Sequence, residues 1–496
     1  MAARTEHHRL GTDAPRLLRR AVTDYAVDHA LLTISRVAAR QLAVGPEHHE
    51  AVLAGYRLAM VVRALLEEDA GAAKGTRRLK EADLGTLCDL ARAAVTSQDS
   101  TFGADAPPNA WSWTHRKAYQ ELPDQDQTHV PRSLVLYRDL ALELQDETGF
   151  HFQAAFARTH GLTLDEAWTA GYGLYRRCLE TQGAPFSAED LTADPRLGSV
   201  DDAKVTSLVG MLSCDYQTYR SMLGVPDGLH PHFEPYNLNP LRKLPILRMP
   251  SGAYLVPLPS FLLRRITHGL YYDLIELDRA GYVEMVGRAF NAYVGRILDG
   301  HQATGLDSSE GRPWVVSDPS NALIIRSITR PFGALSRATG NREHLTADLA
   351  REGGVVDCVQ GLQDMMNDPA EAGHYATAIE GRRAVGLLVA LEDFYLANGR
   401  LIRGIIDEEL RRRDRPAMAA RIQLAHITGL EAICAVSQTA DLGLAAAMAD
   451  KCDDEDLRWL EVDTYARYLS LRMQLEPREP TPQILERAAK RHLDTP

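Results

Sequence analysis

The chain has 496 residues, of which 45% are hydrophobic and 25% charged, and its formal net charge is −12. This length predicts two or three domains, and the composition is that of soluble globular proteins. The acidic balance excludes a general affinity for polyanions such as nucleic acids.

The six cysteines form no CxxC pair and have no regular spacing. A zinc site or a disulfide framework is therefore not predicted, and we expect buried thiols. The N-terminal residues lack an apolar signal segment, and no apolar run approaches the length of a membrane span. We expect a cytoplasmic protein with no membrane partner.

The first half of the chain has helical periodicity. Apolar residues recur every three or four positions from Ala14 to about Val95 and again from Ser133 to Gln182. Thr163, with Glu166 three residues later, forms a capping box that predicts a helix start. Residues 224–260 contain eight prolines, which excludes helix and predicts short extended pieces and a domain boundary.

The second half alternates helix and strand patterns. Trp314–Val316 and Ala322–Ile325 are short apolar runs joined by turn-forming residues, which predicts a β-hairpin. Residues 383–391 form an apolar run typical of a strand buried on both faces, and 421–428 alternate like a strand. From Tyr282 the predicted order is helix, hairpin, helix, strand, helix, strand, helix. This order indicates a small mixed sheet with helices on its faces.

The expected fold is predominantly helical α+β, with an all-α N-terminal region, a small mixed-sheet α/β/α domain and a helical C-terminal tail. The expected domains are a first helical subdomain at 1–105, a second helical subdomain at 133–227 and a nuclease-like sheet domain at 263–450. An irregular linker at 106–132 joins the two helical subdomains. A Pro-rich boundary segment at 228–262 precedes the sheet domain, and a helical tail at 451–496 follows it.

Several short motifs occur in the order found in one known fold. They are residues 239–246, 255–259, 286–294, 317–318, 323–329 and 359–362, together with the two late strands. The chain from Asn239 to Ala440 thus resembles the PD-(D/E)XK, or restriction-endonuclease-like, phosphodiesterase fold. It resembles in particular a bacterial set in which a helical N-terminal region precedes a nuclease-like domain.

The resemblance implies a metal site built from a helix Glu, a hairpin Asp and a strand Glu, with a Lys two residues beyond the strand Glu. The helix Glu falls on Asn291, the hairpin Asp on Asp318, the strand Glu on Arg326 and the Lys on Ile328. Gln360 is a further position of the motif set. Only the aspartate is kept, so we expect an Asp318–Arg326 ion pair, no metal and no cofactor at this site.

The function predicted from this resemblance is a catalytically inactive nuclease-like protein that binds nucleic acid or a partner protein. The arginines that could contact phosphates are Arg264, Arg265, Arg326, Arg330, Arg337 and Arg342.

Two alternatives stay open. The first is an active Mg²⁺-dependent nuclease with migrated ligands, for which Glu310, Asp318 and Glu284 are candidates and Gln360 could position a water. The second is a helical interaction protein in which the sheet only supports a surface.

Overall fold

The computed structural model describes residues 15–44, 49–67, 75–100, 114–116, 118–119, 129–223, 239–301, 303, 313–330, 332–368, 373, 375–392, 394–475 and 482–492. Within these residues the chain is predominantly helical α+β, as predicted, and it has two small sheets. It forms two compact units, described separately below: unit 1 is residues 1–113, 120–130 and 151–279, and unit 2 is 114–119, 131–150 and 280–496.

Unit 1 is a helical bundle with one three-stranded sheet. Its longer helices are α2 (Val27–Val44), α3 (His49–Glu67), α4 (Glu81–Ser100), α8 (Phe152–His160), α9 (Leu164–Glu180), α11 (Asp202–Leu212), α13 (Pro259–Ile266) and α14 (Tyr271–Leu277). Thr163 and Glu166 form the predicted capping box at the start of α9. The Pro-rich segment contributes β2 (Ile246–Arg248) and β3 (Tyr254–Leu255), and β2 pairs in parallel with β1 (Ser213–Asp215). These strands therefore lie inside unit 1, and the change of unit comes at Arg279.

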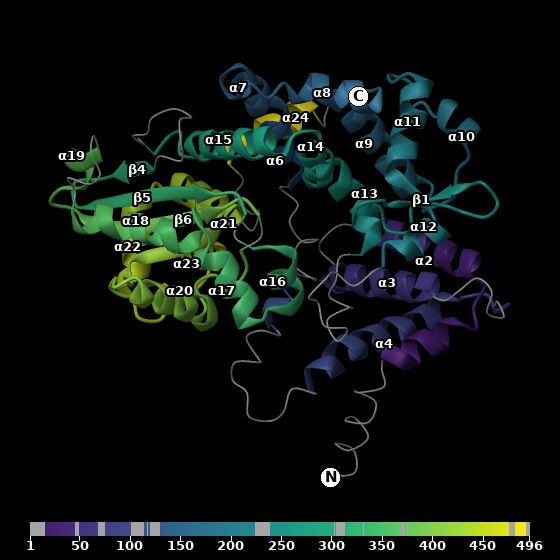
Figure 1. Ribbon diagram of the computed structural model, residues 1–496, viewed down its shortest axis with the longest axis horizontal. Helices are drawn as coiled ribbons and strands as arrows, with labels where there is room; N and C mark the ends of the chain where they lie inside the picture. The colour runs from purple at the N-terminus through teal and green to yellow at the C-terminus, as the bar shows by residue number, and fades with distance from the viewer. Residues whose placement is uncertain are drawn as a thin grey trace, which may run out of the picture. The chain divides into compact units, whose positions relative to one another are not determined.

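Unit 2 is built on a four-stranded sheet in the order β4-β5-β6-β7 (Figure 1). The predicted hairpin is formed by β4 (Trp314–Ser317) and β5 (Asn321–Ile328), which are antiparallel. The later strands β6 (Arg383–Ala390) and β7 (Ile422–His426) follow in parallel, at the predicted places. Their apolar side chains are almost completely buried, as expected for parallel strands covered on both faces.

Helices cover both faces of this sheet. One face packs against α17 (Arg342–Ala350), α18 (Val355–Asn367) and α20 (Arg400–Arg412) in one hydrophobic core. On the other side the sheet contacts α21 (Ile427–Thr439), α22 (Leu444–Asp453) and α23 (Val462–Arg472). The remaining helices of the unit include α6 (His129–Leu134), the π-helix η2 (Val135–Leu140), α7 (Ala141–Thr148), α15 (Arg279–Ile297), α16 (Ala334–Thr339), α19 (Ala376–Ile379) and α24 (Gln483–His492).

The hairpin is held to α15 by Trp314. Its indole Nε1 donates to the carbonyl of Asn291 at 3.0 Å. A Cβ added to Gly295, one turn further along α15, would lie 2.2 Å from the Trp314 ring, so only glycine leaves room for the indole.

Replacing Gly295 with alanine is therefore expected to lower the free energy of unfolding by about 1–3 kcal/mol, because the rigid indole must move. Gly287→Ala is the matched control on the same helix, since its added Cβ would meet nothing within 4 Å. That change should be neutral or stabilising by up to about 1 kcal/mol. Equal urea midpoints for the two variants would contradict this packing.

Two further predictions concern thiols and membranes. All six cysteines are free, five of them buried and Cys88 partly exposed. Among the described residues, no single helix has the length and apolar character needed to cross a membrane. The bent pair α21–α22, with an angle of 116°, meets the criterion by length and composition only.

Candidate functional site

The positions named from the resemblance lie on α15, the β4–β5 hairpin and α18 of unit 2, and the structure separates Asp318 from Arg326. Asp318 follows β4 and lies at the hairpin turn. Arg326 is the sixth residue of β5. At about 3.3 Å per residue, Arg326 is roughly 17 Å along the strand from Asn321, the residue that Asp318 contacts. The prediction of an ion pair between Asp318 and Arg326 is therefore wrong.

Asp318 acts as the cap of its own turn. Its Oδ1 accepts hydrogen bonds from the backbone amides of Ser320 and Asn321, both at 2.8 Å, and both of its oxygens contact the Asn321 side-chain amide. Burial raises the pKa of Asp318, but the hydrogen bonds from Asn321 and Ser320 outweigh burial and leave the pKa below its usual value. The carboxylate is already satisfied by the turn.

Asp318→Ala is expected to cost about 1–2 kcal/mol of stability, because it leaves the turn amides without their acceptor. Thermal unfolding measures this loss. Asp318→Asn keeps one acceptor oxygen and should lose less stability than Asp318→Ala. An equal loss of stability in both variants would contradict a capping role for Asp318.

Asn291 of α15 contacts one face of β5, and the Arg326 side chain of β5 projects from the opposite face. Asn291 is 1% exposed, and its Oδ1 accepts from the Ser327 hydroxyl at 3.1 Å. Arg326 points the other way, toward α18, where a Cβ on Gly361 would lie 2.2 Å from its guanidinium. Ile328 packs on that same face. Side chains alternate along a strand, so a one-residue step separates the two environments.

Neutral groups therefore occupy the place where α15 meets β5. Asn291 and Ser327 meet there, and the Asn291 amide nitrogen is buried without a hydrogen-bond partner. Gln360 is on α18, where its side-chain oxygen can accept from the Arg415 guanidinium at 2.9 Å. Among the described residues, the groups that meet at this position are amide and hydroxyl oxygens, a poor donor set for Mg²⁺.

The migrated-ligand candidates do not converge in the described part of the chain. Glu284 pairs with Arg288 on the surface of α15. Glu310 lies outside the described residues. Within the described ranges, no group of three or more His, Cys, Asp and Glu side chains could hold a metal ion.

Five of the six arginines proposed to contact phosphates have other partners. Arg265, in unit 1, is 1% exposed and donates to Asp273 at 2.7 Å, and its neighbour Arg264 is half-buried and also engaged. In unit 2, Arg330 and Arg337 both bind Glu392, and Arg342 binds Glu408 at 2.5 Å. Only Arg326 has no hydrogen-bond acceptor among the described residues.

A buried ion pair in unit 2 was not predicted. Arg132 of α6 donates two hydrogen bonds of 2.7 Å to the Glu431 carboxylate of α21. The Tyr293 hydroxyl of α15 donates to the same carboxylate at 2.6 Å. Burial and the Glu431 charge raise the pKa of Tyr293 well above its usual value. Nothing local in the sequence marks this pairing, because its charged partners are 299 residues apart.

A second buried polar group lies between β7 and the C-terminal helices of unit 2. Lys451 is 0% exposed, and its Nζ donates to the Gln423 side chain at 2.6 Å and to the Arg458 carbonyl at 3.3 Å. Glu461 accepts from the Asn398 backbone amide at 3.0 Å. Burial lowers the pKa of Lys451 to about 8 and raises the pKa of Glu461 to about 7. The groups that accept hydrogen bonds from Lys451 and the group that donates to Glu461 are neutral, so the charge of each side chain is poorly compensated.

No protein-family model matches this chain, and no curated protein or solved structure does so either.

Proposed function

We propose that this chain is a nuclease-like protein without phosphodiesterase activity that acts by binding a partner protein. The observation that carries the proposal is the Asn291–Ser327 contact, which fills the metal position of such a fold with neutral groups. An amide and a hydroxyl give a divalent ion no charged ligand and supply no base to activate water.

Charge favours a protein partner over nucleic acid. The net charge is −12, and five of the six candidate arginines are already engaged within the fold. An arginine that must leave a carboxylate to reach a phosphate gains little from the exchange.

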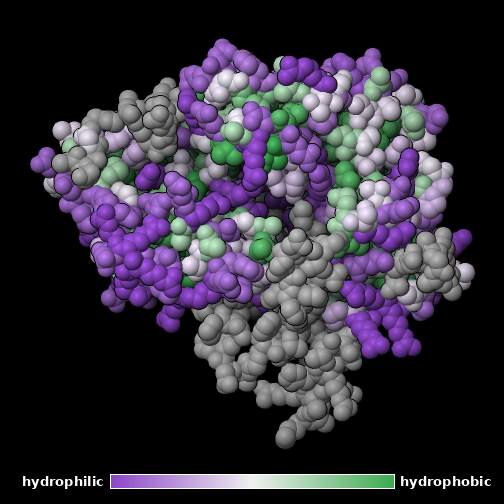
Figure 2. All heavy atoms as spheres, in the orientation of Figure 1, coloured by the Kyte–Doolittle hydropathy of each residue, from purple (hydrophilic) through white to green (hydrophobic). Residues whose placement is uncertain are grey.

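The C-terminal part of unit 2 offers apolar surface for such a partner. Figure 2 shows a largely hydrophilic face with scattered hydrophobic residues. At the end of α23, Tyr468, Leu471 and Met473 are 38%, 73% and 39% exposed. Tyr468 and Leu471 are three residues apart and lie on the same side of the helix.

The proposed absence of phosphodiesterase activity is tested by incubating the protein with labelled single- and double-stranded DNA and RNA in the presence of Mg²⁺ or Mn²⁺. We expect no cleavage. Cutting that Asp318→Ala or Asn291→Ala abolishes would overturn the inactive assignment.

The binding part is tested in two assays. Filter binding across a salt series should show no specific retention of nucleic acid, whereas tight binding that weakens steeply with salt would favour nucleic acid as the partner. Affinity purification should recover a defined protein with the wild-type chain and lose it with Leu471→Glu. Retention of that protein by the variant would exclude the α23 surface.

A further inference from the structure

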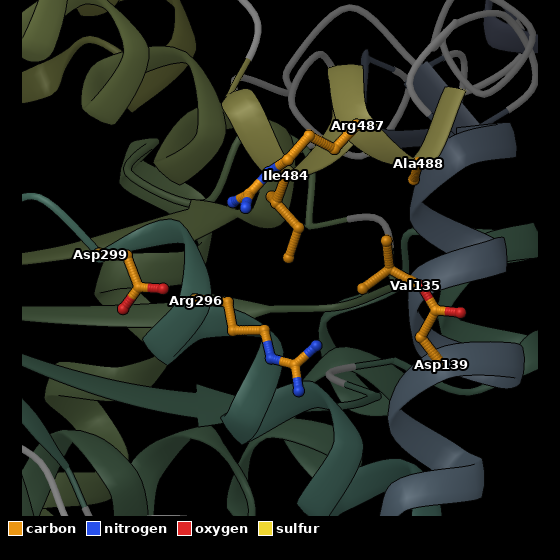
Figure 3. A pocket seen from close by; sticks show the side chains of 7 residues that line it. All are labelled: Val135, Asp139, Arg296, Asp299, Ile484, Arg487 and Ala488. Atoms are coloured by element: carbon orange, nitrogen blue, oxygen red, sulfur yellow. The ribbon is translucent and has the colours of Figure 1, made fainter. Parts of the chain in front are cut away.

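Two adjoining cavities lie beneath α24 in unit 2. Their volumes are about 280 and 350 Å³, and both are lined by Arg296, Asp299, Ile484 and Arg487. Figure 3 shows the first cavity, with α24 above it, Arg296 below and Val135 and Asp139 at one side. These volumes are at the lower end of the roughly 300–1,000 Å³ typical of ligand sites, so the site suits a small molecule.

Two opposite charges in these cavities lack ionic partners among the described residues. Arg296 is neutralised by Glu143. In the described part of the chain, the guanidinium of Arg487 makes one hydrogen bond, of 3.4 Å, to the carbonyl of Gln483 in its own helix. Asp299 is bonded through its backbone carbonyl to Gln438, and its carboxylate has no partner within the described residues.

Arg487 and Asp299 also do not pair with each other, although both line both cavities. Among the described residues, neither takes part in an ion pair within 4.0 Å. The cavity thus presents a donor fork and a separate carboxylate with space between them. A ligand that bridges them must carry both charges.

Part of the wall is apolar, and one side of the first cavity comes from an unusual helix. Val135, Ile484 and Ala488 line the first cavity beside the charges. Val135 and Asp139 belong to η2, a π-helix of six residues. π-helical turns within α-helices are rare and occur frequently at functional sites.

We propose that these cavities bind a small zwitterion with an apolar body, of the class of free aliphatic α-amino acids. The ligand carboxylate would accept from Arg487, its ammonium would donate to Asp299, and its side chain would pack against Val135 and Ile484. This binding is independent of the proposed partner-binding function, since it uses neither the α15–β5 position nor the end of α23.

Isothermal titration of the full chain with leucine, N-acetylleucine and leucinamide tests the proposal. N-acetylleucine lacks the ammonium and leucinamide lacks the carboxylate, so each should bind at least about tenfold more weakly than leucine. Equal binding of either analogue, or no heat with leucine up to about 10 mM, would overturn the proposal.

Two variants locate the site. Arg487→Met should weaken leucine binding at least about tenfold. Asp299→Asn should weaken leucine binding by the same factor and should reduce the difference in affinity between leucine and N-acetylleucine. Arg472→Met, at the exposed end of α23, is the matched control and should bind leucine normally. Unchanged affinity in the Arg487 or Asp299 variant, with circular dichroism showing a folded chain, would place binding elsewhere.

Discussion

Glu431→Ala is expected to lower the stability of unit 2 by about 3–5 kcal/mol, because it leaves a buried guanidinium without its partner. Glu431 is 2% and Arg132 4% exposed, so water cannot replace the lost contacts without opening the core. The Tyr293 hydroxyl loses its acceptor in the same variant. Urea denaturation of the full chain measures the loss.

The control removes both charges together. Arg132→Met with Glu431→Leu leaves no unpaired charge and should recover most of the lost stability, because a buried ion pair is often replaceable by apolar groups. Glu455→Ala, at a glutamate whose side chain is 92% exposed, should change stability little. A Glu431→Ala variant as stable as Glu455→Ala would show that the buried contact contributes nothing.

The stability of unit 2 is expected to fall as the pH rises from about 4.5 to 7. Burial raises the Glu461 pKa from 4.5 to about 7. In this interval the unfolded chain loses the Glu461 proton while the folded chain keeps it. The difference lowers the stability of the folded state by about 3.5 kcal/mol, since one pKa unit corresponds to about 1.4 kcal/mol.

Lys451 produces the opposite slope at higher pH. Its folded pKa of about 8 lies below the usual 10.5. Between these values the unfolded chain binds a proton that the folded chain does not, so the folded state gains stability as the pH rises. Unfolding midpoints should therefore be lowest near pH 7–8.

Two substitutions separate the contributions. Glu461→Gln should remove the fall between pH 4.5 and 7, and Lys451→Met should remove the rise above pH 8. The measurement is the urea midpoint at intervals from pH 4.5 to 10.5. Slopes that persist in these variants would assign the pH dependence to other groups.

The sequence predicted the elements better than their contacts. The hairpin, β6 and β7 were found because period-two apolar patterns and turn residues are local signals, and the α9 capping box is equally local. The faces of β5 were not predicted, since one residue of register decides whether Arg326 meets α15 or α18. The assignment of 131–150 to unit 2 was not predicted either, because contacts such as the Arg132–Glu431 pair join residues that are distant in the sequence.

For the candidate site too, the residue identities could be read from the sequence but the contacts between residues could not. The identities of Asn291, Asp318 and Arg326 led to the prediction that no metal binds there, but the distances between these residues could not be predicted from motif order. The partners of Arg265 and Arg330 were also invisible, because Asp273 and Glu392 come close only in the folded chain. The cavities beneath α24 combine residues from η2, α15 and α24, which no local pattern connects.

The Arg132–Glu431 pair also has a consequence for synthesis on the ribosome. The two residues are 299 positions apart, so at about 5–20 residues per second Arg132 is added to the chain roughly 15–60 seconds before Glu431. During that interval α6 cannot bury its charge, and unit 2 must complete its core after most of unit 1 has been made. A fragment that starts at residue 280 would lack Arg132 altogether, so recombinant versions of unit 2 need residues 114–150 supplied in the same chain or as a second peptide.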